Sequence, residues 1–363
     1  MGLIRPFSEE DVPQVAELHR RVMKTADRPS PELLAEYRAY LVDVLMNHPW
    51  RTEGIGPLVY EEDDGRITGF LAVMPRPLTM GGRDILAAVS SNFCVDPANR
   101  GLVGPKLMNT FLRGPQDLSL TDEANAASRT LWEGCGASAS FLYSMHWTWP
   151  LRLGRCALLF LRGNPGLARL GTMLRPIAGM ADAVASRIGQ NGVHQPDPPL
   201  IEEELDTERF LDCLEQFSSL RALRPRYDRR SFQWVLERIG QLKQYGKLQK
   251  KLLTTAKGEA AGWYLYCLKP RGLSEVLQME ARRPYHRAVL QHLSNHAWRH
   301  DAIGLQGRIN PQFIEALSDK HCLFYGAPRW MLVDSRDPEL VEAFQRGDAL
   351  ISRLEGESCM HFR

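Results

Sequence analysis

One stretch of this 363-residue chain has the residue types of an anion-binding loop: NFCVDPANRGLVGPKLMNTFL, from Asn92 to Leu112. It leads from an apolar segment through Pro97 and two glycines into a helical pattern. The first turn of a helix presents unpaired backbone N–H groups and the positive end of the helix dipole. An anion placed before Lys106 would therefore be stabilised without a dedicated side chain. An ordinary strand-to-helix turn accounts for the same residues, so both interpretations stay open.

The histidines and cysteines are the residues that could bind a metal. His292, His296 and His300 fall on one face of a predicted helix. Histidines four residues apart can bind a metal as a pair, but the first and third lie ~12 Å apart along the axis, so the three cannot share one ion. We interpret them as surface histidines and expect no metal site. The seven cysteines include no Cys-x-x-Cys pair, which argues against a zinc ribbon or a disulfide framework.

The composition is that of a globular protein of about two domains. Hydrophobic residues make up 44% of the chain, which is enough for buried cores, and the net charge of +2 gives no reason to expect nucleic-acid binding. The N-terminus becomes charged within a few residues and lacks the apolar core of a signal peptide, so we expect a cytoplasmic protein. The apolar run from Cys156 to Leu161 is too short to span a bilayer.

The elements around the loop alternate between strand and helix patterns. Asp63-Asp64-Gly65 is a hairpin turn signal between two apolar segments. The predicted elements, in order, are a strand over 3–7, helices over 9–23 and 31–46, the hairpin, a strand over 84–95, a helix over 104–112, a strand in QDLSLTD, a helix in NAASRTLWEGCG and one or two strands in SASFLYSMHWTWP. This order predicts an α/β domain over residues 1–150 with a mixed, largely antiparallel sheet flanked by helices.

Residues 151–200 differ in character, since arginines are spread among apolar residues with breaks at glycine and proline. We interpret this segment as a helical connector that packs on a domain or a partner. A basic amphipathic stretch can also lie on an anionic membrane surface, which leaves peripheral membrane contact through 151–190 as the alternative.

Residues 201–363 repeat the order of elements of the first half. Gly65-x-x-x-Gly69-Phe70 and Gly258-x-x-x-Gly262-Trp263 are offset by 193 residues at both glycines. Two copies of one fold explain the repeated order and the shared offset.

The loop and the helix in NAASRTLWEGCGA together resemble the GNAT superfamily of acyl-CoA-dependent N-acyltransferases. FCVDPANRGLVGPKLM is similar to the family's Val-x-Pro-x-x-Arg-Gly-x-Gly-x-Gly loop, and NAASRTLWEGCGA is similar to its Asn-x-x-Ala-x-x-Leu-Tyr-x-x-x-Gly-Phe helix. The matching residues are Val95, Pro97, Arg100, Gly101, Asn125, Leu131 and Gly136. The resemblance covers about residues 3–150 and includes the order of the elements.

The resemblance implies that backbone amides of Arg100 to Lys106 hold the pyrophosphate of coenzyme A, with acetyl-CoA or a longer acyl-CoA as co-substrate. Asn125 would face the pantetheine arm, although an asparagine in front of a helix is equally well explained as its N-cap. The implied cofactor-binding residues are Cys94, Val95, Arg100, Gly101, Leu102, Val103, Gly104, Lys106, Asn125 and Trp132.

This chain departs from the family pattern at three positions. Val103 and Pro105 replace the second and third glycines of the loop. Pro105 lacks an N–H and removes one donor, although proline suits the first turn of a helix. Trp132 replaces a frequent tyrosine that protonates the leaving thiolate, and an indole cannot act as a general acid. Another group or water does that work, or the domain binds acyl-CoA without turning it over.

An amine acceptor must lose a proton to attack a thioester, so a base is needed near the split between the central strands. Asp122 and Glu123 lie at the end of the strand that borders this split and are the predicted catalytic residues. The alternative is that they are solvated loop charges. His146 lies in an aromatic strand, and we interpret it as a packed histidine.

The sequence thus predicts two tandem GNAT-like domains: residues 1–150 bind acyl-CoA, 151–200 form the connector, and 201–363 form a degenerate copy in which ARRPYHRAVLQ lacks the loop glycines. The first domain would transfer an acyl group to a small-molecule amine or a peptide by direct attack on the thioester. A backbone N–H around Asn92 to Val95 would polarise the carbonyl. The alternatives are a catalytically silent acyl-CoA-binding scaffold and a protein-interaction module. The oligomeric state is not predicted.

Gly101→Val is expected to weaken coenzyme A binding, because a side chain would stand close to the pyrophosphate. Loss of one charge-assisted hydrogen bond costs about 1.5–3 kcal/mol, or roughly tenfold or more in affinity. Asn99→Ala, at the outer edge of the loop, should change the affinity little. Titration of both folded variants with coenzyme A checks this, and parental affinity in Gly101→Val would mean that the stretch is only a turn.

Overall fold

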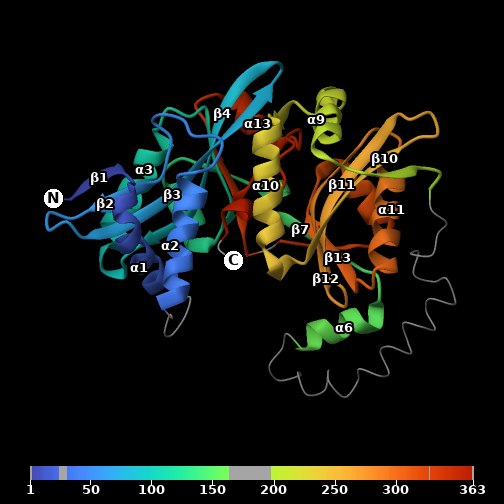
Figure 1. Cartoon of the computed structure of the whole chain (residues 1–363). Helices are drawn as coiled ribbons and strands as arrows, with labels where there is room; N and C mark the ends of the chain where they lie inside the picture. The colour runs from blue at the N-terminus through green and yellow to red at the C-terminus, as the bar shows by residue number, and fades with distance from the viewer. Residues whose placement is uncertain (1, 24–30, 163–197, 327, 362–363) are drawn as a thin grey trace. The chain divides into compact units, whose positions relative to one another are not determined.

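The computed structural model describes residues 2–23, 31–162, 198–326 and 328–361 (Figure 1). These residues form two compact units. Unit 1 consists of Met1–Ser144, Arg221–Ile239 and Ala327–Arg363, and unit 2 consists of Met145–Leu220 and Gly240–Gly326. Most of the predicted connector, residues 163–197, lies outside the described residues. The predicted α/β fold with mixed sheets flanked by helices is confirmed.

Unit 1 contains an eight-stranded sheet with helices packed on it. In the view of Figure 1, α1 and α2 lie over this sheet. Its strands are β1 (Leu3–Pro6), β2 (Leu58–Glu61), β3 (Ile67–Met80), β4 (Arg83–Val95), β5 (Leu118–Ala124), β6 (Ser138–Ser140), β9 (Leu223–Pro225) and β15 (Trp330–Asp334). Its helices are α1 (Val12–Met23), α2 (Pro31–Leu45), α3 (Arg100–Leu112), α4 (Ala126–Gly134), α5 (Phe141–Ser144), most of α10 (Arg229–Gln241) and α13 (Pro338–Gln345), with 3-10 turns η1 (Glu9–Asp11), η2 (Pro97–Asn99) and η6 (Glu357–Met360).

Unit 2 contains a seven-stranded sheet. Its strands are β7 (Met145–Pro150), β8 (Ile201–Glu204), β10 (Lys247–Thr254), β11 (Ala260–Leu268), β12 (Leu273–Ala281), β13 (Gly304–Arg308) and β14 (Leu323–Gly326). Its helices are α6 (Leu153–Arg162), α9 (Thr207–Gln216), α11 (His286–Arg299) and α12 (Ile314–Asp319), with 3-10 turns η3 (Ser218–Leu220), η4 (Lys243–Tyr245) and η5 (Pro311–Phe313).

Seven strands of the first sheet correspond in order to the seven strands of the second. The first has the order β1-β2-β3-β4-β5-β15-β6, with β9 also paired to β3, and the second has the order β8-β10-β11-β12-β13-β7-β14. The pairs β4–β5 and β12–β13 are parallel, and the other pairs are antiparallel. The repeated order of elements read from the sequence therefore appears as a repeated order of strands.

Each sheet takes an inner strand from the other half of the chain, and the first sheet also takes the short strand β9. In the first sheet, β15 lies between β5 and β6, and in the second sheet, β7 lies between β13 and β14. The compact units are therefore interleaved along the chain, whereas the sequence suggested a sequential division at 150 and 200. The difference arises because the last strand of each copy pairs in the other copy's sheet, a non-local choice that a pattern of apolar residues does not encode.

The two Gly-x-x-x-Gly motifs occupy equivalent places in the two units. Gly65 and Gly258 turn the hairpins with φ values of +80° and +79°. At Gly69 a Cβ would come within 2.5 Å of Val103 on α3, and at Gly262 a Cβ would come within 2.8 Å of Val289 on α11. The second glycine of each motif thus lets the helix that follows β4 or β12 pack closely on the sheet.

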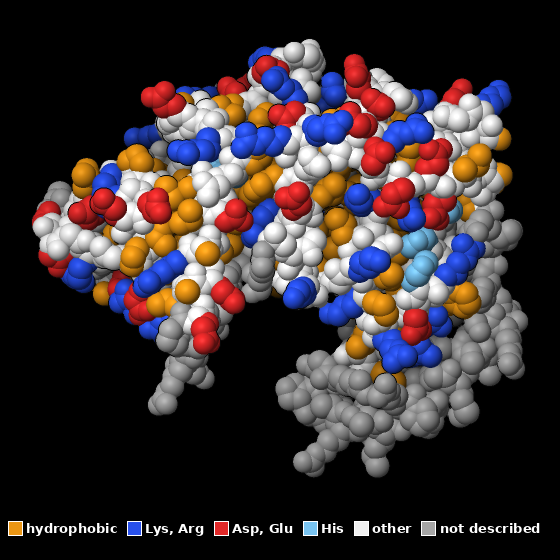
Figure 2. All heavy atoms as spheres, in the orientation of Figure 1, with side chains coloured by type: hydrophobic (Ala, Val, Ile, Leu, Met, Phe, Trp, Pro, Cys, Tyr) orange, Lys and Arg blue, Asp and Glu red, His pale blue; other side chains and the backbone are white. Residues whose placement is uncertain are grey.

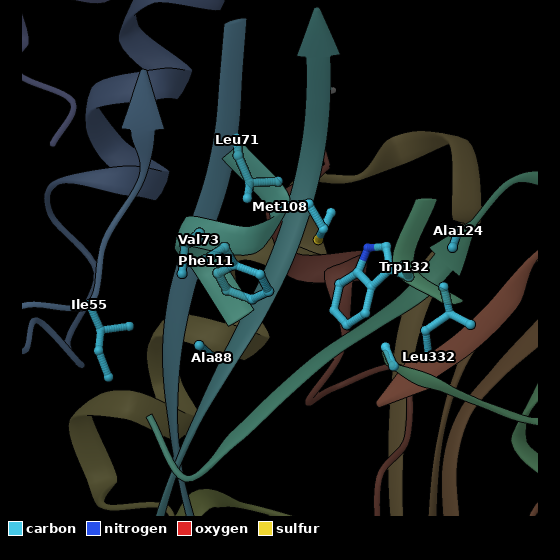
Figure 3. Close-up of a cluster of buried hydrophobic side chains, with 10 residues drawn as sticks. Ile55, Leu71, Val73, Ala88, Met108, Phe111, Ala124, Trp132 and Leu332 are labelled. Atoms are coloured by element: carbon cyan, nitrogen blue, oxygen red, sulfur yellow. The ribbon is translucent and has the colours of Figure 1, made fainter. Parts of the chain in front are cut away.

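The core of unit 1 lies between the sheet and α3 and α4 (Figure 3). Leu71 and Val73 of β3 face Met108 and Phe111 of α3. The buried Trp132 of α4 meets Phe111 edge to face at 5.8 Å between ring centroids. Leu332, contributed by the exchanged strand β15, is fully buried in the same cluster. The C-terminal part of the chain therefore completes this core.

Two local predictions are wrong. The helix predicted over 104–112 begins at Arg100, so Pro105 lies inside the helix and not in its first turn. Of the three histidines predicted to lie on the surface, only His300 is exposed, whereas His292 and His296 are 4% and 7% exposed. Tyr264 pairs with His292 at 3.1 Å and Tyr266 with His296 at 2.7 Å, so tyrosines on β11 satisfy them in the interior. Among the described helices, none is long and apolar enough to cross a membrane.

Leu332→Ala is expected to destabilise unit 1 by about 2–5 kcal/mol, since it leaves a cavity in the core. Exposed Glu339→Ala on α13 is the control and should stay within about 0.5 kcal/mol of the parent. Hydrogen exchange of peptides from β5 and β6 measures the effect. Unchanged exchange in Leu332→Ala would show that β15 does not belong to this sheet.

Candidate active site

The candidate site lies in unit 1, where β4 and β5 diverge. The two strands pair only from Ala87 to Val89 and from Leu118 to Leu120. Beyond these residues β4 continues to Val95 and β5 to Ala124, without further pairing between them. The predicted split between the central strands is therefore present in unit 1.

A bulge at Asn92 bends β4 at this split. The pairing with β3 shifts between Phe70 and Ala72, and Asn92 has a φ of 47°, a conformation that non-glycine residues rarely adopt. Its side-chain amide donates to Tyr40 Oη on α2 at 2.9 Å and also bonds His19 on α1. Tyr40 in turn donates to the carbonyl of Met360. The bulge is thus tied to two helices and, through Tyr40, to the C-terminal segment.

The C-terminal segment, residues 352–361, enters the split through Glu357 of η6. Glu357 Oε1 accepts from Thr121 Oγ1 at 2.5 Å and from the backbone N–H groups of Asp122 and Glu123 at 3.2 and 3.1 Å. Its carboxylate also bonds Ser91 of β4. In return, Asp122 Oδ1 accepts from the backbone N–H of Glu357 at 2.8 Å. One carboxylate therefore contacts both diverging strands.

Glu357 lies in an environment that opposes ionisation of its carboxyl group. Burial, together with the nearby charge of Asp122, raises the pKa of Glu357 to about 7. On the adjoining helix, burial lowers the pKa of His19 to about 4, so its imidazole is neutral at pH 7. Close to neutral pH, Glu357 therefore exchanges a proton readily.

Buried arginines anchor the C-terminal segment. Arg76 of β3 donates to the Glu355 carbonyl at 3.1 Å and to Cys359 Sγ at 2.5 Å, and Arg238 of α10 donates to the His361 carbonyl at 3.3 Å. The Glu355 carboxylate accepts from Tyr227 Oη at 2.9 Å. These contacts give the segment a defined place in unit 1.

The predicted phosphate-binding loop forms the N-terminus of α3. Its first turn carries no acidic residue, and Asn99 makes no side-chain cap but donates to Glu62 at 2.7 Å. A Cβ at Gly101 would meet nothing within 4 Å, and Leu102 is 73% exposed. Gly101 has a helical backbone, a conformation that other residues also adopt. The 3-10 turn η2 runs directly into this end of α3, and the first turn of α3 carries no acidic side chain that would oppose an anion.

The other predicted cofactor residues lie around this turn with varied exposure. Cys94, Val95, Val103 and Gly104 are buried, and Lys106 is half-buried, with its ammonium 5.6 Å from the Tyr60 ring. Arg100 is the first residue of α3. Asn125 is exposed and caps α4 by accepting from the Ser128 N–H at 2.9 Å.

Trp132 is 2% exposed in the core, so packing alone accounts for it. Its contact with a cofactor, like that of Asn125, stays a prediction.

The two predicted catalytic residues lie at the split, and a third carboxylate, that of Glu357, lies there as well. Asp122 is buried beside Glu357. Glu123 faces arginines instead, at 3.1 Å from Arg353 and 3.5 Å from Arg329. Sequence reasoning missed Glu357, because nothing in GESCMHFR distinguishes a glutamate that returns to the split from a solvated one.

Gly356→Ala is expected to dislodge the C-terminal segment, because its Cβ would overlap the carboxylate of Asp122. Overpacking of this kind costs about 1–3 kcal/mol. Gly134→Ala is the matched control, since a Cβ there meets nothing within 4 Å. Hydrogen exchange of residues 352–361 should quicken in Gly356→Ala alone, and equal protection in both variants would contradict the described packing.

Comparison with known proteins gives matches of structure and not of sequence. No protein-family model and no curated protein matches this chain. A GCN5-related N-acetyltransferase from Anabaena variabilis ATCC 29413 has a TM-score of 0.60 at 11% identity, over 93% of this chain and 74% of its own. A conserved protein of unknown function from Enterococcus faecalis V583, described as a probable N-acyltransferase, has a TM-score of 0.58 at 9% identity, over 92% and 72%.

Saccharomyces cerevisiae N-myristoyltransferase, solved with myristoyl-CoA, has a TM-score of 0.50 at 10% identity, over 92% of this chain and 78% of its own. At these identities the likeness concerns the fold, and it extends over both sheets. The chain therefore has the fold of the GCN5-related N-acetyltransferases.

Proposed function

We propose that unit 1 transfers an acyl group from acyl-CoA to an amine. The observation that carries this proposal is the split between β4 and β5, from which β4 leads into the N-terminus of α3. Binding of acyl-CoA uses both features. The pyrophosphate of coenzyme A needs hydrogen-bond donors, and the thioester needs to reach backbone N–H groups between the diverging strands. The fold shared with GCN5-related N-acetyltransferases also supports the proposal.

In this proposal the cofactor's pyrophosphate is held by the first-turn N–H groups of α3, with Lys106 adding charge. The absence of acidic residues in that turn favours an anion, and the open position beside Gly101 leaves room for it. The equivalent helix of unit 2, α11, begins at His286 after Pro284 and Tyr285, with no glycine before it. We therefore assign acyl-CoA binding to unit 1 and treat unit 2 as a degenerate copy.

The chemical step would use the strands that border the split. A backbone N–H of β4 around Asn92 to Val95 polarises the thioester carbonyl, and the bulge at Asn92 turns the backbone there away from regular pairing. Asp122 or Glu123 was the base predicted from sequence, and both lie at the end of β5 next to the split.

The acceptor is proposed to be a small-molecule amine or a peptide, and the acyl group acetyl or longer. On the face seen in Figure 2, basic and acidic side chains are interspersed, with no large surface of one sign. This agrees with the net charge of +2 and does not favour a nucleic-acid substrate. Peripheral membrane contact through 151–190 stays a prediction, since most of that segment lies outside the described residues.

A catalytically silent acyl-CoA-binding scaffold is the second candidate. The observation that favours it is the burial of Trp132, which leaves no general acid at the position of the family's frequent tyrosine. Release of free thiol from acyl-CoA in the presence of amines separates the two candidates.

Full-length protein is expected to bind one coenzyme A per chain, with affinity reduced roughly tenfold or more by Lys106→Glu. Arg283→Glu, a charge reversal at the exposed front of α11, is the matched control and should bind as the parent does. Calorimetric titration gives stoichiometry and affinity together, and a panel of acyl-CoAs and amines then tests turnover. Two sites per chain, or a greater loss in Arg283→Glu, would contradict the assignment to unit 1.

A further inference from the structure

We propose that Glu357 of the C-terminal segment, paired with Asp122, is the group that takes the proton from the acceptor amine. This inference rests on the proposed function and deepens it, since it names a catalytic base that lies outside the first 150 residues. It follows from where the carboxylate lies and from what surrounds it.

Glu357 occupies the place where a base is needed. Its carboxylate bonds Ser91 on β4 and Thr121 on β5, so it lies between the two strands where they diverge. Ser91 immediately precedes Asn92, the start of the β4 backbone proposed to polarise the thioester carbonyl. The proton acceptor would thus bond the residue that precedes the carbonyl-polarising backbone, which places the two groups on the same side of the split for attack by an amine.

The other two carboxylates at the split, those of Asp122 and Glu123, are engaged in other contacts. Glu123 faces Arg353 and Arg329. Asp122 accepts the backbone N–H of Glu357, so it holds η6 in place and adds negative charge beside the Glu357 carboxylate. Asp122 therefore acts on the base and positions it, while Glu357 reaches both strands.

The surroundings of Glu357 suit proton transfer at neutral pH. Burial and the charge of Asp122 raise its pKa to about 7, close to the value at which a general base is most effective. The hydrogen bonds from Thr121 and Ser91 oppose this shift by stabilising the ionised form. The titratable and charged groups that face this part of unit 1 are Asp122, Glu123, Arg76, Arg238, Arg353, Tyr40, Cys359 and His361.

The proposed reaction is a proton transfer to Glu357 followed by acyl transfer to the free amine. The ionised Glu357 takes one proton from the ammonium form of the acceptor and becomes neutral. The free amine attacks the thioester carbon, so a C–N bond forms and the C–S bond breaks. The second proton of the attacking nitrogen goes to the departing thiolate, which leaves as coenzyme A thiol. Glu357 then returns its proton to solvent.

The pH profile of coenzyme A release tests this role. With an acyl-CoA and an amine that the parent turns over, kcat/KM should rise with pH through an inflection near 7, since the base must be ionised. Glu357→Gln should lose that inflection and about 10²- to 10⁴-fold in kcat/KM above it. Asp122→Asn should move the inflection to lower pH, because removing the neighbouring negative charge favours ionisation of Glu357.

Glu355→Gln is the matched control for displacement of the segment. Glu355 lies two residues away, is as deeply buried, and burial likewise raises its pKa, but it bonds Tyr227 and Ser352 and not the split. This variant should keep the inflection near 7. If Glu355→Gln abolishes the inflection as Glu357→Gln does, the segment acts only as a structural plug and the proposal fails.

An infrared titration follows the protonation of the Glu357 carboxyl group and does not depend on turnover. The full-length parent should show a protonated carboxyl band that disappears near pH 7 and is missing in Glu357→Gln. A parent without that band, or turnover in Glu357→Gln with an unchanged inflection, overturns the role of Glu357 while acyl transfer stands. A parent that releases no coenzyme A with any amine overturns the proposed function itself, and the assignment of the base with it.

Discussion

The divergence of β4 from β5 is the constraint on which the candidate site depends. Three residues of each strand pair in parallel, and the left-handed backbone at Asn92 then bends β4 away from regular pairing. Backbone groups left between diverging strands need partners. On β5 the N–H groups of Asp122 and Glu123 find one in the carboxylate of Glu357. The hydrogen bonds of Asn92 and Tyr40 then connect the bulge to the same C-terminal segment.

The C-terminal part of the chain contributes to unit 1 in two ways. Its strand β15 places Leu332 in the core, and its last turn places Glu357 in the split. Core stability and the chemistry of the split are therefore coupled through one stretch of sequence. Two copies that exchange their last strands cannot be separated by cutting the chain between them, so experiments on this protein need the full length.

Local features were predictable from sequence, and the site was predictable in part. The hairpin at Gly65 and the strand before the loop follow from turn chemistry and alternation, which act over a few residues. The start of α3 at Arg100 was missed, because Pro105 and Gly104 read as a helix opening while packing of Val103 on Gly69 favours an earlier start. The burial of His292 could be predicted only by knowing that Tyr264 lies opposite it. Glu357 and the strand exchange are non-local in the same way, so residue patterns carried no signal for them.

A crystal structure of the full-length protein with a non-hydrolysable acyl-CoA analogue tests the central claim most directly. The account predicts the pyrophosphate against the first-turn N–H groups of α3 and the acyl end in the split, within reach of the β4 backbone and the Glu357 carboxylate. An analogue bound at α11 of unit 2, or bound at α3 with its acyl end outside the split, would contradict the account.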